Sequence, residues 1–182
     1  MSAKKREDGP DGLVVVDKEA GWTSLDVVAK SRGLLGTRKV GHSGTLDPDA
    51  TGILLLGVGR VTRLLKYLTA LPKTYTCEIV FGTETSTLDS SGDITATHEM
   101  SALTFAQVEA AVPELTGDIM QIPPMVSALK IDGKRLHELA REGIEVERAP
   151  RPVTIYRFRV APTADPLVVT AEVECSSGTY VR

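Results

Sequence analysis

A single carboxylate in a glycine-rich loop is the feature of this 182-residue sequence that best fits catalysis. Residues 41–52 read Gly-His-Ser-Gly-Thr-Leu-Asp-Pro-Asp-Ala-Thr-Gly, and glycines permit tight turns and a close approach of the backbone to a ligand. Pro48 biases Asp47 towards an extended conformation, which holds its carboxylate in one orientation. An ionised aspartate can act as a nucleophile at neutral pH. The same Asp-Pro pair also describes a simple turn.

Two other chemical patterns fail in this region on spacing. A phosphate-binding P-loop needs Gly, four residues and then Gly-Lys-Ser/Thr, and neither residues 33–39 nor the 41–52 loop has this order. A nucleophile elbow needs Gly-x-Ser-x-Gly, but Ser43 directly precedes Gly44. Because His42 is adjacent to Ser43, their side chains point apart, which is poor geometry for a nucleophile and its base. A serine hydrolase is therefore a distant alternative.

The composition is that of a globular protein and removes several functional classes. Hydrophobic residues make up 42% and charged residues 25% of the chain, and no apolar run approaches the ~20 residues that a membrane span needs. The charged N-terminus lacks the apolar segment of a secretory signal, so we expect a cytoplasmic location and no membrane partner. Two cysteines fit a reducing compartment, and three scattered histidines have no zinc-ligand spacing, so no metal is expected.

The charge distribution permits an RNA partner without establishing one. The net charge is −3, but residues 74–129 hold eight acidic and no basic residues. The rest of the chain carries all 21 basic residues against 16 acidic ones, a balance of +5. Clusters at 38–39, 60–66 and 130–159 can form a phosphate-binding face, and a dispersed, solvated surface explains them equally well.

Hydrophobic periodicity predicts an α+β fold, a mixed and largely antiparallel sheet flanked by helices. Alternation and short apolar runs predict strands at 13–16 (buried), 53–56, 75–81, 119–122 and 126–131. Two further strands are expected to close the chain. The first is expected to point Tyr156, Phe158 and Val160 inward, and the second Val169, Ala171, Val173 and Cys175. Helices are expected after caps at Ser24 and Thr104, at 60–71 and at 134–142, with a loop at 83–93 and a turn at Asp132-Gly133. The helix after Ser24 is expected to carry Leu25, Val28, Ala29, Leu34 and Leu35.

The 41–52 loop and several other short motifs resemble those of the bacterial tRNA pseudouridine-55 synthases, the TruB-type family of pseudouridine synthases. The 41–52 loop is similar to the family's catalytic motif, and the other matching segments follow in chain order over essentially everything after residue 11. They are Asp17-Lys18, Gly21-Trp22-Thr23-Ser24, Lys73-Thr74-Tyr75, the 83–92 loop with Asp89, Pro123-Pro124, 126–130, 133–135, 139–143 and 175–182. One such match is weak evidence, whereas a set in the right order is strong.

The resemblance implies the pseudouridine synthase fold and the isomerisation of uridine-55 in the tRNA T-loop to pseudouridine. Such a reaction imports no group and oxidises nothing, so no cofactor is expected. By similarity Asp47 is the nucleophile, Tyr75 lies against the uracil ring and removes the proton from carbon five, and Arg182 pairs with Asp47. Periodicity alone makes Tyr75 an equally good core residue.

The resemblance also implies substrate contacts. His42 and Tyr180 are expected to contact RNA or base, while Lys18 and Asp89 are expected in the charge network around the site. A uridine inside a folded T-loop must be flipped out, and recognition then rests on shape, phosphates and 2′-hydroxyls. The tRNA T-arm is the expected partner, with no obligate protein partner. Candidate backbone contacts are Arg38, Lys39, Arg60, Lys130, Lys134 and Arg141.

The domain prediction has three parts. Residues 1–10 are expected to form a mobile tail, and residues 11–182 a catalytic domain that is incomplete at its C-terminal end. The family's small C-terminal RNA-binding domain is expected to be absent, because the sequence stops directly after the Gly-Thr-Tyr-Val-Arg segment. A non-catalytic RNA-binding or tRNA-folding module is therefore the alternative function.

Overall fold

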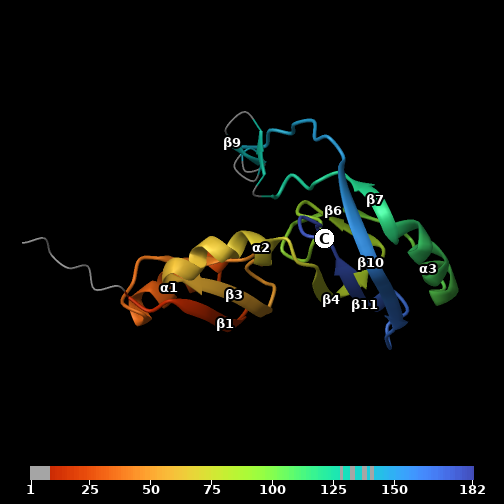
Figure 1. The fold of residues 1–182 in the computed structure, drawn as a ribbon. Coiled ribbons are helices and arrows are strands. Elements are labelled where there is room, and N and C mark those ends of the chain that lie inside the picture. The colour runs from red at the N-terminus through yellow and green to blue at the C-terminus, as the bar shows by residue number, and fades with distance from the viewer. Residues whose placement is uncertain (1–8, 128, 132–133, 137–138, 140–141) are drawn as a thin grey trace, which may run out of the picture. The chain divides into compact units, whose positions relative to one another are not determined.

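The computed structural model describes residues 9–127, 129–131, 134–136, 139 and 142–182. The chain divides into two units, Met1–Leu71 and Pro72–Arg182, here called the N-terminal and C-terminal units (Figure 1). Each unit has its own sheet, and the functional residues predicted from the sequence are shared between them.

The N-terminal unit is a three-stranded antiparallel sheet in the order β1-β3-β2. Strand β3 (Gly52–Val58) pairs with β1 (Gly12–Lys18) on one side and β2 (Val40–His42) on the other. Helix α1 (Ser24–Leu34) packs on this sheet, as Figure 1 shows. The buried core comprises Val27, Val28, Val40, Leu54, Leu56 and Val58.

Two expectations for this unit are confirmed in part. The strand predicted at 13–16 exists, but only one face is covered: Val14 and Val16 pack against the core, whereas Leu13 and Val15 are 53% and 65% exposed. The predicted helix at 60–71 starts as a 3-10 helix, η1 (Gly59–Leu64), and becomes α-helical only in α2 (Leu65–Thr69).

The predicted cap of α1 is wrong by one residue. Thr23, not Ser24, is the N-cap: the Asp26 N–H donates to Thr23 Oγ1 at 3.1 Å, and the Asp26 carboxylate accepts from the Thr23 N–H at 2.9 Å. This reciprocal pair is a capping box. The predicted apolar face is also partly wrong, because Leu25, Ala29 and Leu34 are exposed and Val27 is buried instead.

The C-terminal unit is built on a four-stranded antiparallel sheet in the order β4-β11-β10-β7. These strands are β4 (Lys73–Val80), β7 (Gly117–Gln121), β10 (Arg151–Pro162) and β11 (Val168–Cys175). Helix α3 (Phe105–Ala111) continues into the 3-10 turn η2 (Val112–Leu115), and Thr104 caps it as predicted. Two hairpins complete the described elements: β5 (Thr83–Thr85) with β6 (Ile94–Thr97), and β8 (Lys130–Ile131) with β9 (Lys134–Arg135).

The predicted alternation is confirmed on β11 and fails in part on β10. On β11 the inward residues are Val169, Ala171, Val173 and Cys175, as predicted. On β10, Tyr156 is 53% exposed, which corrects the prediction that it points inward. An irregularity in the β10–β11 register between Ile155 and Arg157 changes the face, so Val153 and Ile155 point inward before it and Phe158 after it.

Three further predictions need correction. The loop expected at 83–93 contains strand β5, and the strand expected at 126–131 is reduced to β8. Strand β9 occupies the start of the predicted 134–142 helix. The predicted turn at Asp132-Gly133, candidate contact Arg141 and most of the 1–10 tail lie outside the described residues.

The fold class is confirmed as α+β, and every strand pairing in the described ranges is antiparallel. Within those same ranges, no helix has the length and apolar character needed to cross a membrane.

Candidate active site

The loop that carries Asp47 joins two neighbouring strands of the N-terminal unit. Strand β2 ends at His42 and β3 begins at Gly52, so both ends of the loop are fixed in one sheet. The Asp47 side chain is exposed, and its own carbonyl accepts a hydrogen bond from the Ala50 N–H at 3.1 Å. Residues 47–50 therefore form a turn in which Asp47 is exposed.

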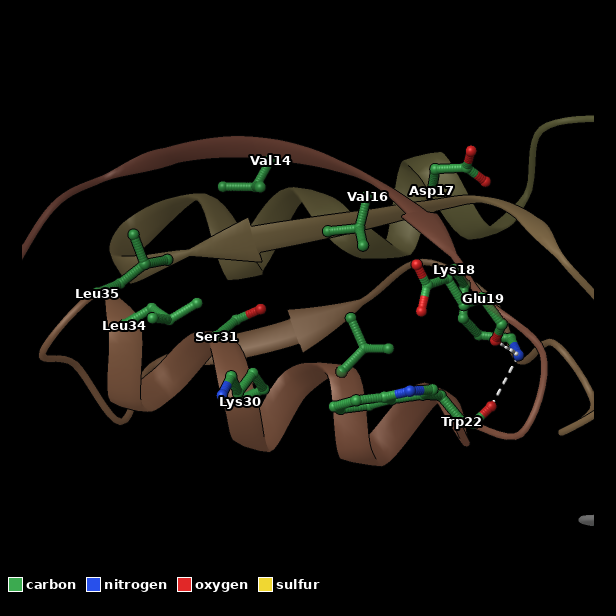
Figure 2. Close-up of a pocket in the computed structure, with 11 residues that line it drawn as sticks. Val14, Val16, Asp17, Lys18, Glu19, Trp22, Lys30, Ser31, Leu34 and Leu35 are labelled. Atoms are coloured by element: carbon green, nitrogen blue, oxygen red, sulfur yellow. Dashed lines mark hydrogen bonds between the residues drawn. The ribbon is translucent and has the colours of Figure 1, made fainter.

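Lys18 anchors this loop on the C-terminal side of Asp47. The Lys18 side chain is buried, with 1% exposed, and its Nζ donates to the carbonyls of Glu19 (3.0 Å), Trp22 (2.7 Å) and Pro48 (3.0 Å). Figure 2 shows the Lys18 ammonium turned towards the carbonyl of Trp22. Three backbone acceptors match the three donors of an ammonium group. Lys18 thus ties the 19–22 turn to the residue that follows Asp47.

Gly21 adds a second bond to the same carbonyl. Its φ of 83° lies in the region that favours glycine, and its N–H donates to the Pro48 carbonyl at 2.9 Å. On the other side of Asp47, Ser24 bonds to the backbone of Leu46. The chain is therefore held immediately before and immediately after the candidate nucleophile.

The first residues of the loop are also tied locally. His42 Nδ1 donates to the Gly44 carbonyl at 2.6 Å, and the Ser43 N–H donates to the Leu55 carbonyl at 3.0 Å. Ser43 is buried, with 6% exposed. A buried serine whose neighbouring histidine bonds to a backbone carbonyl does not form a nucleophile–base pair in this conformation.

A cavity of about 310 Å³ lies beside Lys18, between α1 and β1 (Figure 2). Its walls are mainly apolar, and Figure 2 shows the Trp22 ring lying along α1 at one end. The lining residues are Val14, Val16, Asp17, Lys18, Glu19, Trp22, Val27, Lys30, Ser31, Leu34 and Leu35. The buried Lys18 side chain thus both lines this cavity and anchors the Asp47 loop.

The C-terminal unit carries the other predicted catalytic residues. Tyr75 lies on β4 opposite Val173 of β11, is partly buried, and packs against the cluster of Ile155, Val173 and Cys175. The contact with this cluster confirms that Tyr75 packs against the core, and its role against the uracil ring stays a prediction.

Arg182 pairs with Asp89 in this unit. Arg182 Nη1 and Asp89 Oδ2 are 3.0 Å apart, and the two side chains are 10% and 29% exposed. Asp89 Oδ1 accepts from Thr87 Oγ1 (2.7 Å), the Ser91 N–H (3.0 Å) and Ser91 Oγ (2.5 Å). Partial burial opposes ionisation of Asp89, but the bonds from Ser91 and Thr87 and the Arg182 charge outweigh it and lower its pKa.

The last segment of the chain is fixed to β7 through Gln121. Gln121 Nε2 donates to the Tyr180 carbonyl at 2.8 Å, and the Tyr180 N–H donates to Gln121 Oε1 at 2.9 Å. The Ser176 N–H also donates to the Thr154 carbonyl at 2.8 Å. Backbone anchors therefore position Tyr180, and with it the nearby Arg182.

The predicted residues fall into two groups, one in each unit. Lys18, His42 and Asp47 belong to the N-terminal unit, and Tyr75, Asp89, Tyr180 and Arg182 to the C-terminal unit. The predicted Arg182–Asp47 pair joins residues of different units and stays a prediction. Within the described ranges, no group of three or more His, Cys, Asp or Glu residues is arranged to hold a metal ion.

Sequence reasoning missed three residues that shape these groups: Ser24, Ser91 and Gln121. Of the three, Ser91 was the easiest to predict from the sequence, because an aspartate two residues before a serine is a common turn pattern. Nothing in the sequence joins Ser24 to Leu46 or Gln121 to Tyr180, which are 22 and 59 residues apart. Among the candidate RNA contacts, Arg60 pairs with Asp11 at 2.6 Å, while Arg38 and Lys39 are exposed.

A match to a family model, together with the α+β fold, identifies the class of this protein. Residues 32–181 match the family model described as "TruB family pseudouridylate synthase (N terminal domain)". That match covers well over half of the chain. The chain belongs to this family.

Curated relatives named tRNA pseudouridine synthase B share about half of its residues. Identity is 56% to the protein from Rhodococcus jostii, 51% to that from an Arthrobacter species and 50% to that from Streptomyces coelicolor. These matches cover 94–95% of this chain but only 57–60% of the relatives. The chain thus spans less than two thirds of their length.

Solved structures support the fold. A Cbf5-Nop10-Gar1 complex contains a chain that matches with a TM-score of 0.67 and 27% identity, over 94% of this chain and 41% of that one. A chain of an H/ACA RNP bound to a substrate RNA containing 2′-deoxyuridine matches with a TM-score of 0.64 and 22% identity, over 94% of this chain and 39% of that one. At that identity, the second match bears on the fold alone.

Proposed function

We propose that this chain carries the catalytic part of a tRNA pseudouridine synthase that converts uridine-55 of the T-loop to pseudouridine. The observation that carries the proposal is the exposed Asp47 carboxylate, held between two anchored backbone positions in a chain of this family. Residues 11–182 form the catalytic portion, and a tRNA-modifying enzyme works in the cytoplasm.

Asp47 acts as the nucleophile. The C1′–N1 bond of the uridine breaks, uracil turns, a C1′–C5 bond forms, and the proton on carbon five leaves. A carboxylate suits this exchange because it can add to the pyrimidine ring or to the sugar carbon and then leave again. The hydrogen bonds to Leu46 and Pro48 fix the backbone on both sides of Asp47, which lowers the free-energy cost of placing its carboxylate in the reactive geometry.

Tyr75 and Arg182 complete the proposed site. Tyr75 lies against the uracil ring and accepts the proton from carbon five. The family resemblance implies that Arg182 pairs with Asp47, and such a pair would keep the carboxylate ionised and oriented. The Arg182–Asp89 ion pair uses Nη1, and a guanidinium presents five N–H donors in a fork.

The substrate enters as a flipped nucleotide. Extruding a base from a folded T-loop costs a few kcal/mol, which contacts to the T-arm must repay. His42 and Tyr180 contact the base or its neighbours. Exposed cations such as Arg38 and Lys39 contact phosphates, so binding weakens as salt rises.

The test is tritium release from tRNA labelled at carbon five of uridine. We expect this chain to release tritium from a tRNA with uridine at position 55 and not from the same tRNA with cytidine there. Pseudouridine at position 55 is then identified in the digested product. Binding of both tRNAs without tritium release contradicts the proposal and favours a non-catalytic RNA-binding or tRNA-folding module.

A further inference from the structure

Ser24 is the first residue of α1, yet its side chain does not serve the helix. Thr23 provides the cap, through the reciprocal bonds with Asp26. The Ser24 side chain is instead buried, with 2% exposed, at the junction between α1 and the Asp47 loop. A hydroxyl in such a place must find its partners within the protein.

The partners of Ser24 are both backbone groups of one residue. The Leu46 N–H donates to Ser24 Oγ at 2.9 Å, and Ser24 Oγ donates to the Leu46 carbonyl at 3.3 Å. Leu46 immediately precedes Asp47, and its side chain packs against the core of the N-terminal unit. One hydroxyl therefore satisfies both polar backbone groups of the residue before the candidate nucleophile.

This contact differs in kind from the anchor on the other side of Asp47. The Pro48 carbonyl has two donors, Lys18 Nζ and the Gly21 N–H, so loss of one leaves the other. At Leu46 one serine oxygen is the partner of both the N–H and the carbonyl. Removing that oxygen releases the backbone before Asp47 while α1 keeps its cap.

We propose that Ser24 is a positioning residue for Asp47, acting through the Leu46 backbone. The proposal rests on the proposed function of Asp47 as the nucleophile. A displacement of about 1 Å in a reacting group can cost about 100-fold in rate, even when the displaced group still binds substrate. Loss of the Ser24 hydroxyl is therefore expected to lower the rate of the chemical step more than the affinity for tRNA.

The experiment compares Ser24→Ala with Thr23→Ala in the tritium-release assay. Thr23→Ala is a matched control, because it removes the cap of the same helix one residue away and leaves the Ser24–Leu46 bonds in place. We expect Ser24→Ala to lower kcat by about 10- to 100-fold with KM within about twofold. Thr23→Ala should lower the melting temperature and leave kcat within about twofold of the parent.

A second readout does not depend on turnover. We expect the Leu46 amide to exchange its hydrogen at least about 10-fold faster in Ser24→Ala than in the parent and in Thr23→Ala. If the parent releases no tritium, the proposed function fails, and unchanged Leu46 exchange then overturns the anchoring role of Ser24 as well. In an active parent, a kcat of Ser24→Ala equal to the parent's, or an equal loss in both variants, overturns the positioning role.

Discussion

The loops that carry Asp47 and Asp89 are held by different contacts. In the N-terminal unit the anchors bind the backbone on either side of Asp47, at Leu46 and Pro48. In the C-terminal unit, Thr87, Ser91 and Arg182 bind the carboxylate of Asp89, and Thr85 Oγ1 also donates to the Asp89 carbonyl at 2.6 Å. The proposed role of Asp47 requires a fixed backbone beside its carboxylate, whereas the carboxylate of Asp89 itself binds Thr87 and Ser91 of its own loop and Arg182.

The comparison distinguishes the carboxylate that we propose to be reactive, Asp47, from one that is bonded within its own loop, Asp89. Asp89 is surrounded by donors that favour its charged form, so its pKa is lowered despite partial burial. Asp47 is exposed on a turn whose neighbours carry the described anchors. Mutations at the anchors should therefore have different consequences in the two loops.

The largest effect on stability is expected from Lys18→Met. The substitution keeps an apolar stem but leaves the part-buried carbonyls of Glu19 and Trp22 without this donor, which should cost about 2 kcal/mol of unfolding free energy. Urea unfolding measures the loss. Lys30→Met, at an exposed position on the same cavity, is the control and should change the value by less than about 0.5 kcal/mol. Equal losses would show that Lys18 is no anchor.

The next effect concerns pH. Because the pKa of Asp89 is lower in the folded than in the unfolded chain, its contribution to stability is present above the unfolded pKa and is lost as pH falls through the folded one. Asp89→Asn should cost about 1 kcal/mol at pH 7 and flatten the fall in stability below about pH 4. Unfolding measured from pH 7 to pH 2 tests this. Asp93→Asn, an exposed position in the same loop, should keep the parent's slope.

A smaller effect is expected at the anchor of the last segment. Gln121→Ala removes both bonds to Tyr180 and should cost about 1 kcal/mol, with hydrogen exchange at the Tyr180 amide becoming at least about 10-fold faster. Amide exchange followed by NMR measures the change. If exchange at Tyr180 keeps the parent's rate, Gln121 does not hold this segment.

The smallest effect has the opposite sign. Among the described residues, Leu88, beside Asp89, is a non-glycine residue with a positive φ of 62°, and it is 59% exposed. Leu88→Gly should relieve this strain and raise the unfolding free energy by a few tenths of a kcal/mol, after the entropy of the unfolded chain is counted. Thermal unfolding measures it. A clear loss of stability would mean that Leu88 contributes packing that outweighs its strained backbone.

Much of the fold was predictable because its signals are local. The alternation along β11 and the cap at Thr104 both follow from a few neighbouring residues, and both are confirmed. The irregularity near Tyr156 was not predictable, since an extra residue changes the face of a strand without altering its composition. Thr23 and Ser24 are both good caps, and tertiary contact with Leu46 decides between them.

The sequence predicts a set of candidate site residues, which stays a prediction, but it does not predict the contacts that hold them. Asp47 was found from its Asp-Pro context and the family resemblance, which is a property of the loop itself. Its anchors at Lys18 and Ser24 depend on contacts made across 30 and 22 residues, which periodicity does not report. The Arg182–Asp89 pair likewise joins a β5–β6 loop to the end of the chain.

The most direct test of the central difference compares Asp47→Asn with Asp89→Asn, each measured for tritium release and for unfolding free energy. We predict that Asp47→Asn lowers turnover by at least about 1000-fold and changes stability by less than about 0.5 kcal/mol. Asp89→Asn should lose stability and keep more turnover than Asp47→Asn. Turnover that survives in Asp47→Asn and disappears in a folded Asp89→Asn would contradict the account, because the two acids would then have exchanged roles.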